Sequence, residues 1–452
     1  ALYGIARVAR RRGDHAAALA RLRDTIAIIE SVRSTLANPS LKSDFLADKR
    51  DVYDAAIAIL LESPQRDAAQ LFHWFEQARA RNLRDAMRGS TAPPTLAAVQ
   101  GRLREDSAVV EYWIGEGRLA ALWVTRGGSG VMDRAWTAED AASVRALDWP
   151  VNASLLRGIP WERIRRVAIV PDGVLYLLPF EALPVDAGGA LLIERMPVSY
   201  LPSASLLFRD EVSRTALAPW RPQLAAFGDP SGTLPEAARE LRSIARALGG
   251  RAALYDGPSD LKRHLLGDAL AGVPLLHFAT HATVDLADSN RSRMQFTPER
   301  DNPGSEYLFR SEVQMLPLEG ADLVTLSACE TEAGRVVRGE GIQSFSRAFL
   351  AAGARTTITT LWRVEDRATA EFMSVFYKSL GQRRSKSDAL RDAKLSFLHR
   401  GGTYALPQTW AAFVLNGDGD TPLRPVLSWW RVAGIAGVIA AAILLWRRRR
   451  VG

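Results

Sequence analysis

The sequence of 452 residues contains only one cysteine, Cys329. A single thiol cannot form a disulfide within the chain, so no disulfide framework holds this fold together. It also excludes the zinc sites that are built from several cysteines. The six histidines are scattered, and the sequence offers no ligand cluster of the kind that metal-dependent hydrolases need. We therefore expect a protein that works without a metal or another cofactor.

The chain also has no excess of acidic residues. Its formal net charge is +8, and four of the positive charges lie at positions 447–450. No basic stripe interleaved with aromatic residues is present, so we expect no nucleic-acid partner. With 47% hydrophobic and 24% charged residues, the composition is that of a folded protein. Because the chain begins with Ala1 and not methionine, we expect a processed or truncated product, from which a targeting signal could be missing.

Residues 1–90 are predicted to be helical. Apolar residues recur at helical spacing, a turn interrupts them at residues 13–14, and an alanine-rich helix follows. This layout is that of a tetratricopeptide unit, although only one such unit is visible and about three make a stable array. A second helical pair is expected over residues 49–61 and 67–87. The alternative is a helical bundle of another kind.

The pattern changes after the glycine- and proline-containing linker at residues 89–94. Two strands are predicted first, over residues 108–113 and 119–124. From about residue 160, short apolar runs alternate with amphipathic helices, which indicates an α/β fold with a mostly parallel sheet covered on both faces. We expect one domain over residues 95–420. Its predicted strands are 167–170, 224–227, 275–279, 323–328 and 356–359, and its predicted helices are 235–248, 342–352, 368–380 and 387–399.

The end of the chain is predicted to meet a membrane. Residues 432–446 are 15 almost wholly apolar residues without a charge, shorter than the roughly 20 of a full span. Trp429 and Trp430 precede them and four arginines follow, as at a membrane interface. We expect a single-pass membrane segment over residues 426–452, with a buried core helix as the alternative. The side of the membrane on which the domain lies is left open, because the arginine run favours the outside of the cytoplasm and a reduced thiol favours the cytoplasm. An apolar stretch followed by an arginine run also resembles the C-terminal sorting signals of bacterial surface proteins, which are cut off.

Two chemically useful residues follow predicted strands. His281 comes just after the strand at 275–279 and Cys329 directly after the strand at 323–328, 48 residues further on. Parallel strands end at the same edge of a sheet, where α/β sites are built, and the order and spacing are those of caspases. An imidazole can stabilise a thiolate and later protonate a leaving amine. The backbone N–H groups of Ala282 and Cys329 could hold the oxyanion.

Each of these residues also has a structural interpretation. A lone cysteine is often a small buried apolar residue, and a histidine at the end of a strand is often only hydrogen-bonded. His277 lies inside the strand, so we expect a structural role for it. The pairing of His281 with Cys329 is what favours chemistry over these alternatives.

A family resemblance adds to this interpretation. Residues 275–281 (LLHFATH) and 326–331 (LSACET) resemble the histidine and cysteine motifs of CHAT domains. Residues 78–83 (ARARNL) resemble the segment that joins tetratricopeptide repeats to such domains. Further matches, in the family's order, are 170–173 (VPDG), 178–184 (LPFEALP), 200–204 (YLPSA), 339–341 (GEG), 347–355 (RAFLAAGAR), 361–366 (LWRVED) and 410–415 (WAAFVL).

The resemblance implies a caspase-like fold, akin to separase and gingipain, that cuts peptide bonds with a Cys–His dyad and no metal. The dyad maps onto His281 and Cys329. One departure is Ala282, which stands where the family usually has glycine. Alanine keeps the N–H, but its Cβ would crowd the site if the position needed a positive φ.

The loop after residue 361 bears on specificity. In separase-like relatives an acidic residue of this loop faces the residue before the cut and selects a basic one. We expect Asp366, with Glu365 beside it, to bind an arginine or lysine of the substrate. The alternative is that Asp366 only caps the helix that starts near Arg367.

Together these features predict a membrane-tethered cysteine endopeptidase of protein or peptide substrates. It would be latent until a protein partner acts on the helical region, an expectation that the repeat-like residues 1–90 motivate. The alternative is a non-catalytic scaffold in which the repeats bind partners and the CHAT fold holds them.

Overall fold

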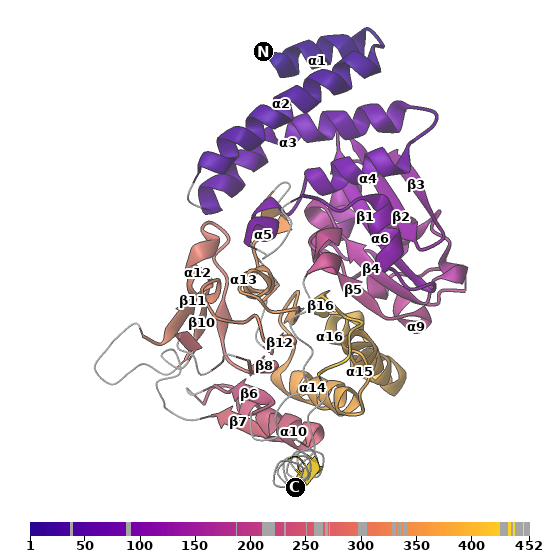
Figure 1. The fold of residues 1–452 in the computed structure, drawn as a ribbon. Coiled ribbons are helices and arrows are strands. Elements are labelled where there is room, and N and C mark those ends of the chain that lie inside the picture. The colour runs from indigo at the N-terminus through magenta and orange to yellow at the C-terminus, as the bar shows by residue number, and fades with distance from the viewer. Residues whose placement is uncertain are drawn as a thin grey trace.

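The computed structural model describes most of the chain. The described residues are 1–36, 39–86, 92–186, 188–209, 222–229, 232–249, 251–256, 265–266, 270, 272–296, 305–327, 331–332, 334, 336–337, 341–424, 433–434, 437–438 and 446. Within these ranges a set of helices leads into a large α/β body (Figure 1). The predicted fold class is confirmed for the helical start and for the mostly parallel sheet.

The helical spacing at the start of the chain produces α1 (Leu2–Arg11) and α2 (His15–Thr35), which pack as a hairpin. Asp14 caps α2 because its side chain accepts a hydrogen bond from the Ala17 N–H. Four helices follow: α3 (Pro39–Glu62), α4 (Ala68–Gln77), α5 (Arg81–Ala86) and α6 (Leu96–Arg102). The prediction of one helix over residues 67–87 is wrong. Ala80 has a φ of 50°, which a right-handed helix cannot contain, so the chain breaks between α4 and α5.

One large sheet forms the body. It has 11 strands in the order β3-β2-β1-β4-β5-β16-β15-β12-β8-β6-β7. β15, β12, β8, β6 and β7 run parallel to one another, as do β1, β4, β5 and β16, and the two halves meet at the antiparallel pair β15–β16. The strands are β1 (Ser107–Gly115), β2 (Arg118–Thr125), β3 (Gly128–Ala135), β4 (Arg166–Val170), β5 (Val198–Tyr200), β6 (Leu224–Phe227), β7 (Ala252–Tyr255), β8 (Leu275–Phe278), β12 (Leu323–Leu326), β15 (Thr356–Thr360) and β16 (Phe413–Gly417).

Both faces of the parallel half are covered by helices. Along β6, Leu224 and Ala226 join the cluster under α10 (Ala237–Leu248), α14 (Asp366–Gly381) and α15 (Lys386–Arg400). Ala225 and Phe227 point the other way, into the cluster with α12 (Arg310–Val313) and α13 (Phe345–Ala351). Because neither face meets water, both sets of alternating residues are apolar, which explains the continuous apolar runs of the sequence.

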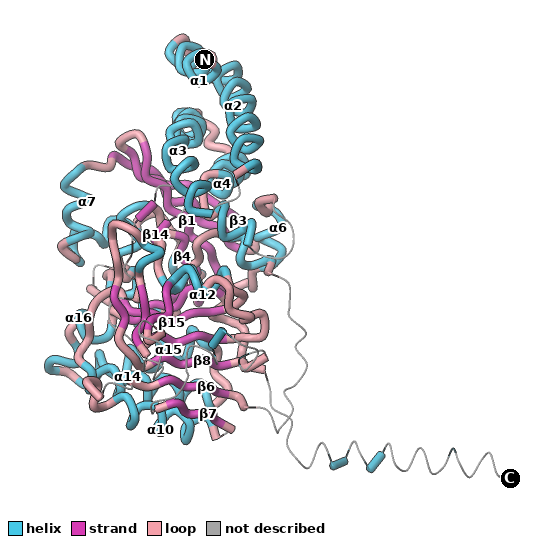
Figure 2. Tube along the Cα trace, turned by 90° about the vertical axis from the view of Figure 1, so that its left-hand side faces the viewer, coloured by secondary structure: helices cyan, strands magenta, loops and turns pink. Residues whose placement is uncertain are grey.

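The helical region is not packed as a separate unit. Leu71 and Phe75 of α4 share one buried cluster with Val109 and Trp113 of β1. Figure 2 shows these helices stacked at one end of the sheet, over β1. A buried polar contact fixes the junction: the Arg50 guanidinium of α3 bonds to Asp54 at 2.8 Å and to Asp172, just after β4, at 3.0 Å.

Smaller elements complete the described fold. β9 (Ala282–Thr283), β10 (Arg293–Gln295) and β11 (Tyr307–Phe309) form a separate sheet, and β13 (Val336–Val337) pairs with β14 (Gly341–Ile342). The other α-helices of the described residues are α7 (Ala138–Arg145), α8 (Trp149–Asn152), α9 (Leu192–Arg195) and α16 (Pro407–Trp410). Among the residues described, no helix combines the length and apolarity that a membrane crossing requires. The predicted segment 426–452 falls almost entirely outside them.

Candidate active site

Three adjacent parallel strands end side by side and carry the candidate residues. Phe227 at the end of β6 pairs with Phe278 at the end of β8, which pairs with Leu326 at the end of β12. The chain then continues to Asp229 after β6 and to His281 after β8. Cys329, predicted as the nucleophile, lies outside the described residues, which break off after Ser327 and resume at Thr331. The strand-end position of His281 is therefore as the sequence predicts.

His281 is held by a buried carboxylate through a hydroxyl group. Its side chain is 36% exposed, and its Nε2 lies 2.6 Å from Oγ1 of Thr233 and 3.9 Å from Oδ2 of Asp229. The Asp229 side chain is only 2% exposed. Its Oδ2 accepts hydrogen bonds from Oγ1 of Thr233 at 3.1 Å and from the Leu234 N–H at 2.7 Å.

The proton positions in this chain of contacts follow from its chemistry. A hydroxyl group has one proton, and Thr233 donates it to the acceptor-only carboxylate of Asp229. The Thr233 oxygen must then accept from His281, so neutral His281 carries its proton on Nε2. Its Nδ1 is left as the basic nitrogen, able to take a proton from a thiol.

Asp229 and Thr233 are functional candidates that the sequence interpretation missed. The signal was present, because Asp229 follows the apolar run 224–227 just as His281 follows 275–279. The same edge of the sheet collects all such residues. The contact through Thr233 carries no comparable sequence signal.

The backbone at Ala282 suits an oxyanion donor. The Gln295 N–H donates to the His281 carbonyl at 2.9 Å, so the next pair of β9 and β10, Ala282 with Met294, is a non-hydrogen-bonded pair. The Ala282 N–H therefore points away from β10, at the edge of this three-stranded sheet. Ala282 is not among the described residues with positive φ, so alanine in place of glycine causes no backbone strain here.

A cavity of about 290 Å³ opens at these strand ends, and we call it the strand-end pocket. Thr280, Ser327 and Thr360 contribute from the ends of β8, β12 and β15. Glu365 and Asp366 lie on its wall with Arg363 nearby. The complete lining is Leu234, Thr280, Ser327, Thr360, Arg363, Val364, Glu365, Asp366 and Thr369. The two predicted specificity residues thus share one cavity with the strand ends.

Asp366 does not cap its own helix, so that alternative is wrong. It is the first residue of α14, and Glu365 before it makes no side-chain capping bond. The Asp366 Oδ2 instead accepts from the Glu236 N–H at 3.1 Å. Partial burial raises the pKa of Asp366, and the neighbouring carboxylates of Glu240, Glu236 and Asp229 act in the same direction. Several carboxylates thus lie close together at this edge of the sheet.

Two buried titratable residues lie close to these strand ends. His277 is fully buried between Tyr377, whose hydroxyl is 3.2 Å from Nδ1, and Glu240, whose Oε1 is 2.9 Å from Nε2. This environment fits the structural role expected of it. Glu332, three residues after the cysteine, accepts from Thr359 at 2.6 Å and from Asn416 at 3.3 Å. Burial raises the pKa of Glu332 to about 7.

No group of three or more histidine, aspartate or glutamate residues able to hold a metal occurs among the residues that the structure describes. The chemistry of the site consists of a positioned imidazole, an outward-pointing N–H group and a negative pocket. Such a set suits acid–base work beside a nucleophile and the binding of a cationic side chain.

Comparison with known proteins places this geometry in context. Residues 143–418, more than half of the chain, match the family described as the CHAT domain. Tetratricopeptide repeat protein 28 is 26% identical over 320 residues in Homo sapiens and 27% identical over 321 in Mus musculus. Each match covers 60% of this chain but only 12% and 13% of those proteins, so the chain corresponds to a small part of them.

Solved structures of two other proteins match parts of this chain. Separase, in its complex with securin from Saccharomyces cerevisiae, superposes with a TM-score of 0.52 at 12% identity. That match covers 89% of this chain and 37% of the separase chain. The Arg-specific cysteine proteinase gingipain R superposes with a TM-score of 0.40 at 13% identity, over 64% of this chain and 69% of its own. At such identities the likeness with separase concerns the fold alone.

Proposed function

Because the chain belongs to the CHAT family, we propose that it is a cysteine endopeptidase with Cys329 as nucleophile and His281 as acid and base. The observation that carries this proposal is the placement of His281, whose imidazole is fixed at a strand end by a buried acid. This contact engages only Nε2 of His281, so Nδ1 is left for proton transfer beside Thr280, which lines the strand-end pocket.

In the proposed reaction the Cys329 thiol passes its proton to Nδ1 of His281, and the thiolate attacks the carbonyl carbon of the scissile peptide bond. The carbonyl oxygen becomes an oxyanion that the N–H groups of Ala282 and Cys329 stabilise. The proton on Nδ1 then moves to the amide nitrogen, the C–N bond breaks and a thioester remains. Water, deprotonated by His281, attacks the thioester and releases the acid and the thiol.

Asp229 and Thr233 position the imidazole in this proposal. Their contacts keep the Nε2–H tautomer and the ring orientation. The carboxylate of Asp229 also stabilises the imidazolium that forms when the thiol loses its proton. Asp229 thus acts through His281 and has no contact with substrate in the mechanism.

The strand-end pocket supports a preference for a basic residue before the cut. Glu365 and Asp366 line it, and the buried Asp229 adds to the negative field. An arginine side chain entering the pocket would form charge-assisted hydrogen bonds with Asp366. Arg363 lines the same pocket and would weaken this attraction, so we expect a preference and not absolute selection.

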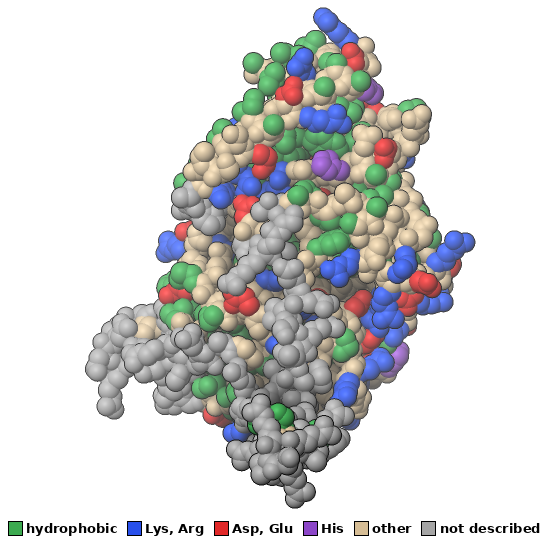
Figure 3. Space-filling model, in the orientation of Figure 1, with side chains coloured by type: hydrophobic (Ala, Val, Ile, Leu, Met, Phe, Trp, Pro, Cys, Tyr) green, Lys and Arg blue, Asp and Glu red, His purple; other side chains and the backbone are tan. Residues whose placement is uncertain are grey.

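We further propose that a protein partner controls the peptidase through the helical region, and that residues 426–452 tether it to a membrane. Apolar side chains are exposed over the N-terminal helices at the top of Figure 3. Ile5 and Val8 of α1 and Ile28 and Val32 of α2 are 44–55% exposed. Arg50 links α3 to Asp172 of the α/β body, so a change in these helices can reach the sheet.

The test uses the full chain in detergent with a peptide library. Cleavage by the wild type that is lost in Cys329→Ala and in His281→Ala would establish the dyad. His399→Ala is the matched control, because this exposed histidine ends α15 away from the strand ends. A thiol probe such as iodoacetamide covers the latent state: labelling of Cys329 that depends on His281 supports a peptidase awaiting its partner. A thiol that stays inert in every variant favours the non-catalytic scaffold.

A further inference from the structure

A second cavity, which shares no residue with the strand-end pocket, is lined by arginines. Its volume is about 390 Å³, within the range of small-molecule sites. It lies where β16 pairs with β5 through the single residue pair Asn416–Tyr200. We call it the arginine cavity. Its lining is residues 102–104, 107–109, 166–168, 199, 201, 206, 207, 209, 355 and 417–422.

Positive charge exceeds negative charge in this lining. The arginines are Arg102, Arg104, Arg166, Arg209 and Arg355, and the only acids are Asp418 and Asp420. Both acids are already engaged. Asp418 pairs with Arg355 at 3.1 Å, and Asp420 pairs with Arg166 at 3.0 Å.

None of the other three arginines pairs with an acid of the lining in the described part of the chain. Arg102 lies over the ring of Phe208, with no carboxylate partner among the described residues. Arg104 has only a loose contact with Asp106, at 3.4 Å, and is exposed.

Arg209 is the most confined of these guanidinium groups. It donates to the carbonyl groups of Leu350 and Ala354 at the end of α13, and no described carboxylate pairs with it. Burial lowers the pKa of Arg209 to about 10, with Arg355 adding repulsion and the Glu319 carboxylate opposing it in part. An anion in the cavity would relieve this cost.

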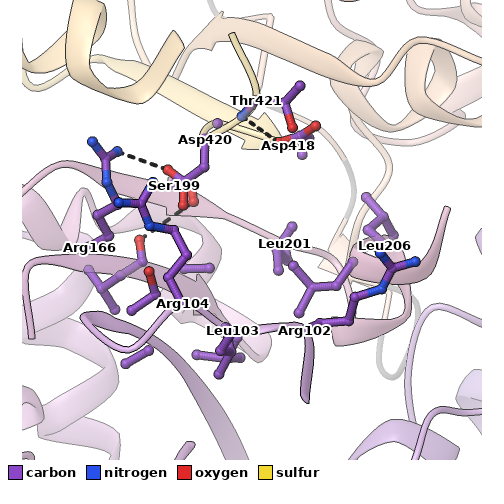
Figure 4. Close-up of a pocket in the computed structure, with 18 of the residues that line it drawn as sticks. Arg102, Leu103, Arg104, Arg166, Ser199, Leu201, Leu206, Asp418, Asp420 and Thr421 are labelled. Carbon is purple, nitrogen blue, oxygen red and sulfur yellow. Dashed lines mark hydrogen bonds and ion pairs between the residues drawn. The ribbon is translucent and has the colours of Figure 1, made fainter. Parts of the chain in front are cut away.

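The cavity combines these charges with apolar walls. Figure 4 shows Arg102 beside Leu206 at one end and Arg104, Arg166 and Asp420 at the other, with Leu103 and Leu201 between them. Val109, Val167 and Ala168 also line it. A fully hydrated inorganic ion would make no apolar contact with these walls, so the lining suits an anion with an apolar body.

We propose that the arginine cavity binds a small organic phosphate with an apolar body. A phosphate monoester carries about −1.5 to −2 charges at pH 7 and three acceptor oxygens. It can therefore accept hydrogen bonds from more than one guanidinium group, whereas a carboxylate is matched by one bidentate arginine. The two acids in the lining are consumed by Arg166 and Arg355, so they do not repel such a ligand strongly.

The test measures binding directly by calorimetry with the full chain in detergent, so it does not depend on peptidase activity. The probes are adenosine 5′-monophosphate, phenyl phosphate, adenosine and inorganic phosphate. The variant is Arg102→Gln/Arg104→Gln, since both side chains are exposed. The control is Arg157→Gln/Arg163→Gln, which removes the same charge from exposed arginines outside the cavity.

We expect one of the two organic phosphates to bind with 1:1 stoichiometry, and adenosine and inorganic phosphate to bind at least about tenfold more weakly. The cavity variant should weaken binding about tenfold or more, and the control variant less than about twofold. Absence of saturable binding by both organic phosphates at millimolar concentration would overturn the proposal. So would equal losses in the cavity variant and its control, or tighter binding of inorganic phosphate than of either ester.

Discussion

The two cavities of this molecule differ in charge and in how the chain builds them. The strand-end pocket has two acids and one arginine in its lining, and it draws most of its walls from residues at or soon after the ends of β8, β12 and β15. The arginine cavity is positive and collects its walls from segments scattered between residues 102 and 422. One cavity is a direct product of strand order, whereas the other exists only because distant segments meet.

The two cavities also differ in how their charged side chains are paired. In the strand-end pocket burial raises the pKa of Asp366, and nearby carboxylates, among them the buried Asp229, add to this effect. In the arginine cavity the two acids of the lining pair with Arg355 and Arg166, and Arg102 and Arg209 have no carboxylate partner among the described residues. Unbalanced charge beside a cavity is what an oppositely charged ligand can neutralise, so the two cavities should bind ligands of opposite sign.

The largest effect is expected at the buried acid behind His281. Asp229→Asn keeps the size of the side chain but removes the charge that stabilises the imidazolium. We expect kcat/KM for a peptide to fall roughly a hundredfold, and the midpoint of Cys329 alkylation by iodoacetamide to move to higher pH. Asp256→Asn is the control, since it neutralises the exposed acid that follows the next strand, β7. An unchanged alkylation profile would leave Asp229 with a purely structural role.

A smaller effect is expected on substrate choice. Glu365→Gln/Asp366→Asn should lower the preference for arginine over a neutral residue before the cut by about tenfold, since two charges leave the pocket. Cleavage of a peptide pair that differs at this one position measures it. Glu371→Gln on the same helix is the control, because its carboxylate is paired with Arg367 and Arg400 instead. If the control and the pocket variant changed the ratio equally, the pocket would not be the specificity site.

Salt should weaken ligand binding in the arginine cavity a few-fold more than it changes the reactivity at the strand ends. Raising NaCl from 50 to 500 mM screens the exposed Arg102 and Arg104 and should weaken binding of an organic phosphate several-fold. The rate at which iodoacetamide, a neutral reagent, alkylates Cys329 should change less than twofold. Calorimetry and alkylation rates on the same samples make the comparison, and phosphate binding that is insensitive to salt would argue against a charge-driven site.

The smallest effect concerns Glu332, which accepts hydrogen bonds from Thr359 and Asn416. Thr359 precedes Thr360 of the strand-end pocket, and Asn416 precedes Gly417 of the arginine cavity. Because burial raises the folded pKa of Glu332 to about 7, the folded state holds a proton that the unfolded state has lost. Stability from this group is thus present below about pH 4.5 and falls as the pH rises to about 7. Glu332→Gln should flatten this dependence, measured as the midpoint of urea unfolding from pH 5 to 8. A variant curve parallel to that of the wild type would contradict the shift.

Much of the fold could be predicted because it depends on neighbours in the sequence. The apolar run at 224–227 became β6, and the helix expected over 387–399 became α15 (Lys386–Arg400). The break at Ala80 could not be predicted, because its positive φ is tolerated only in the packed structure and no glycine marks it. The antiparallel β16, which reverses the direction of half of the sheet, is likewise set by pairing and not by pattern.

The sequence by itself determined that His281 follows a buried strand, because apolar runs specify strands and parallel strands share the edge at which they end. It also determined the family, through motifs that keep their order along the chain. Only the tertiary structure decided that Thr233 and Asp229 hold His281, and that five arginines from distant segments surround one cavity. These contacts join residues far apart in the chain, and they depend on how loops close and side chains pack, which no local pattern encodes.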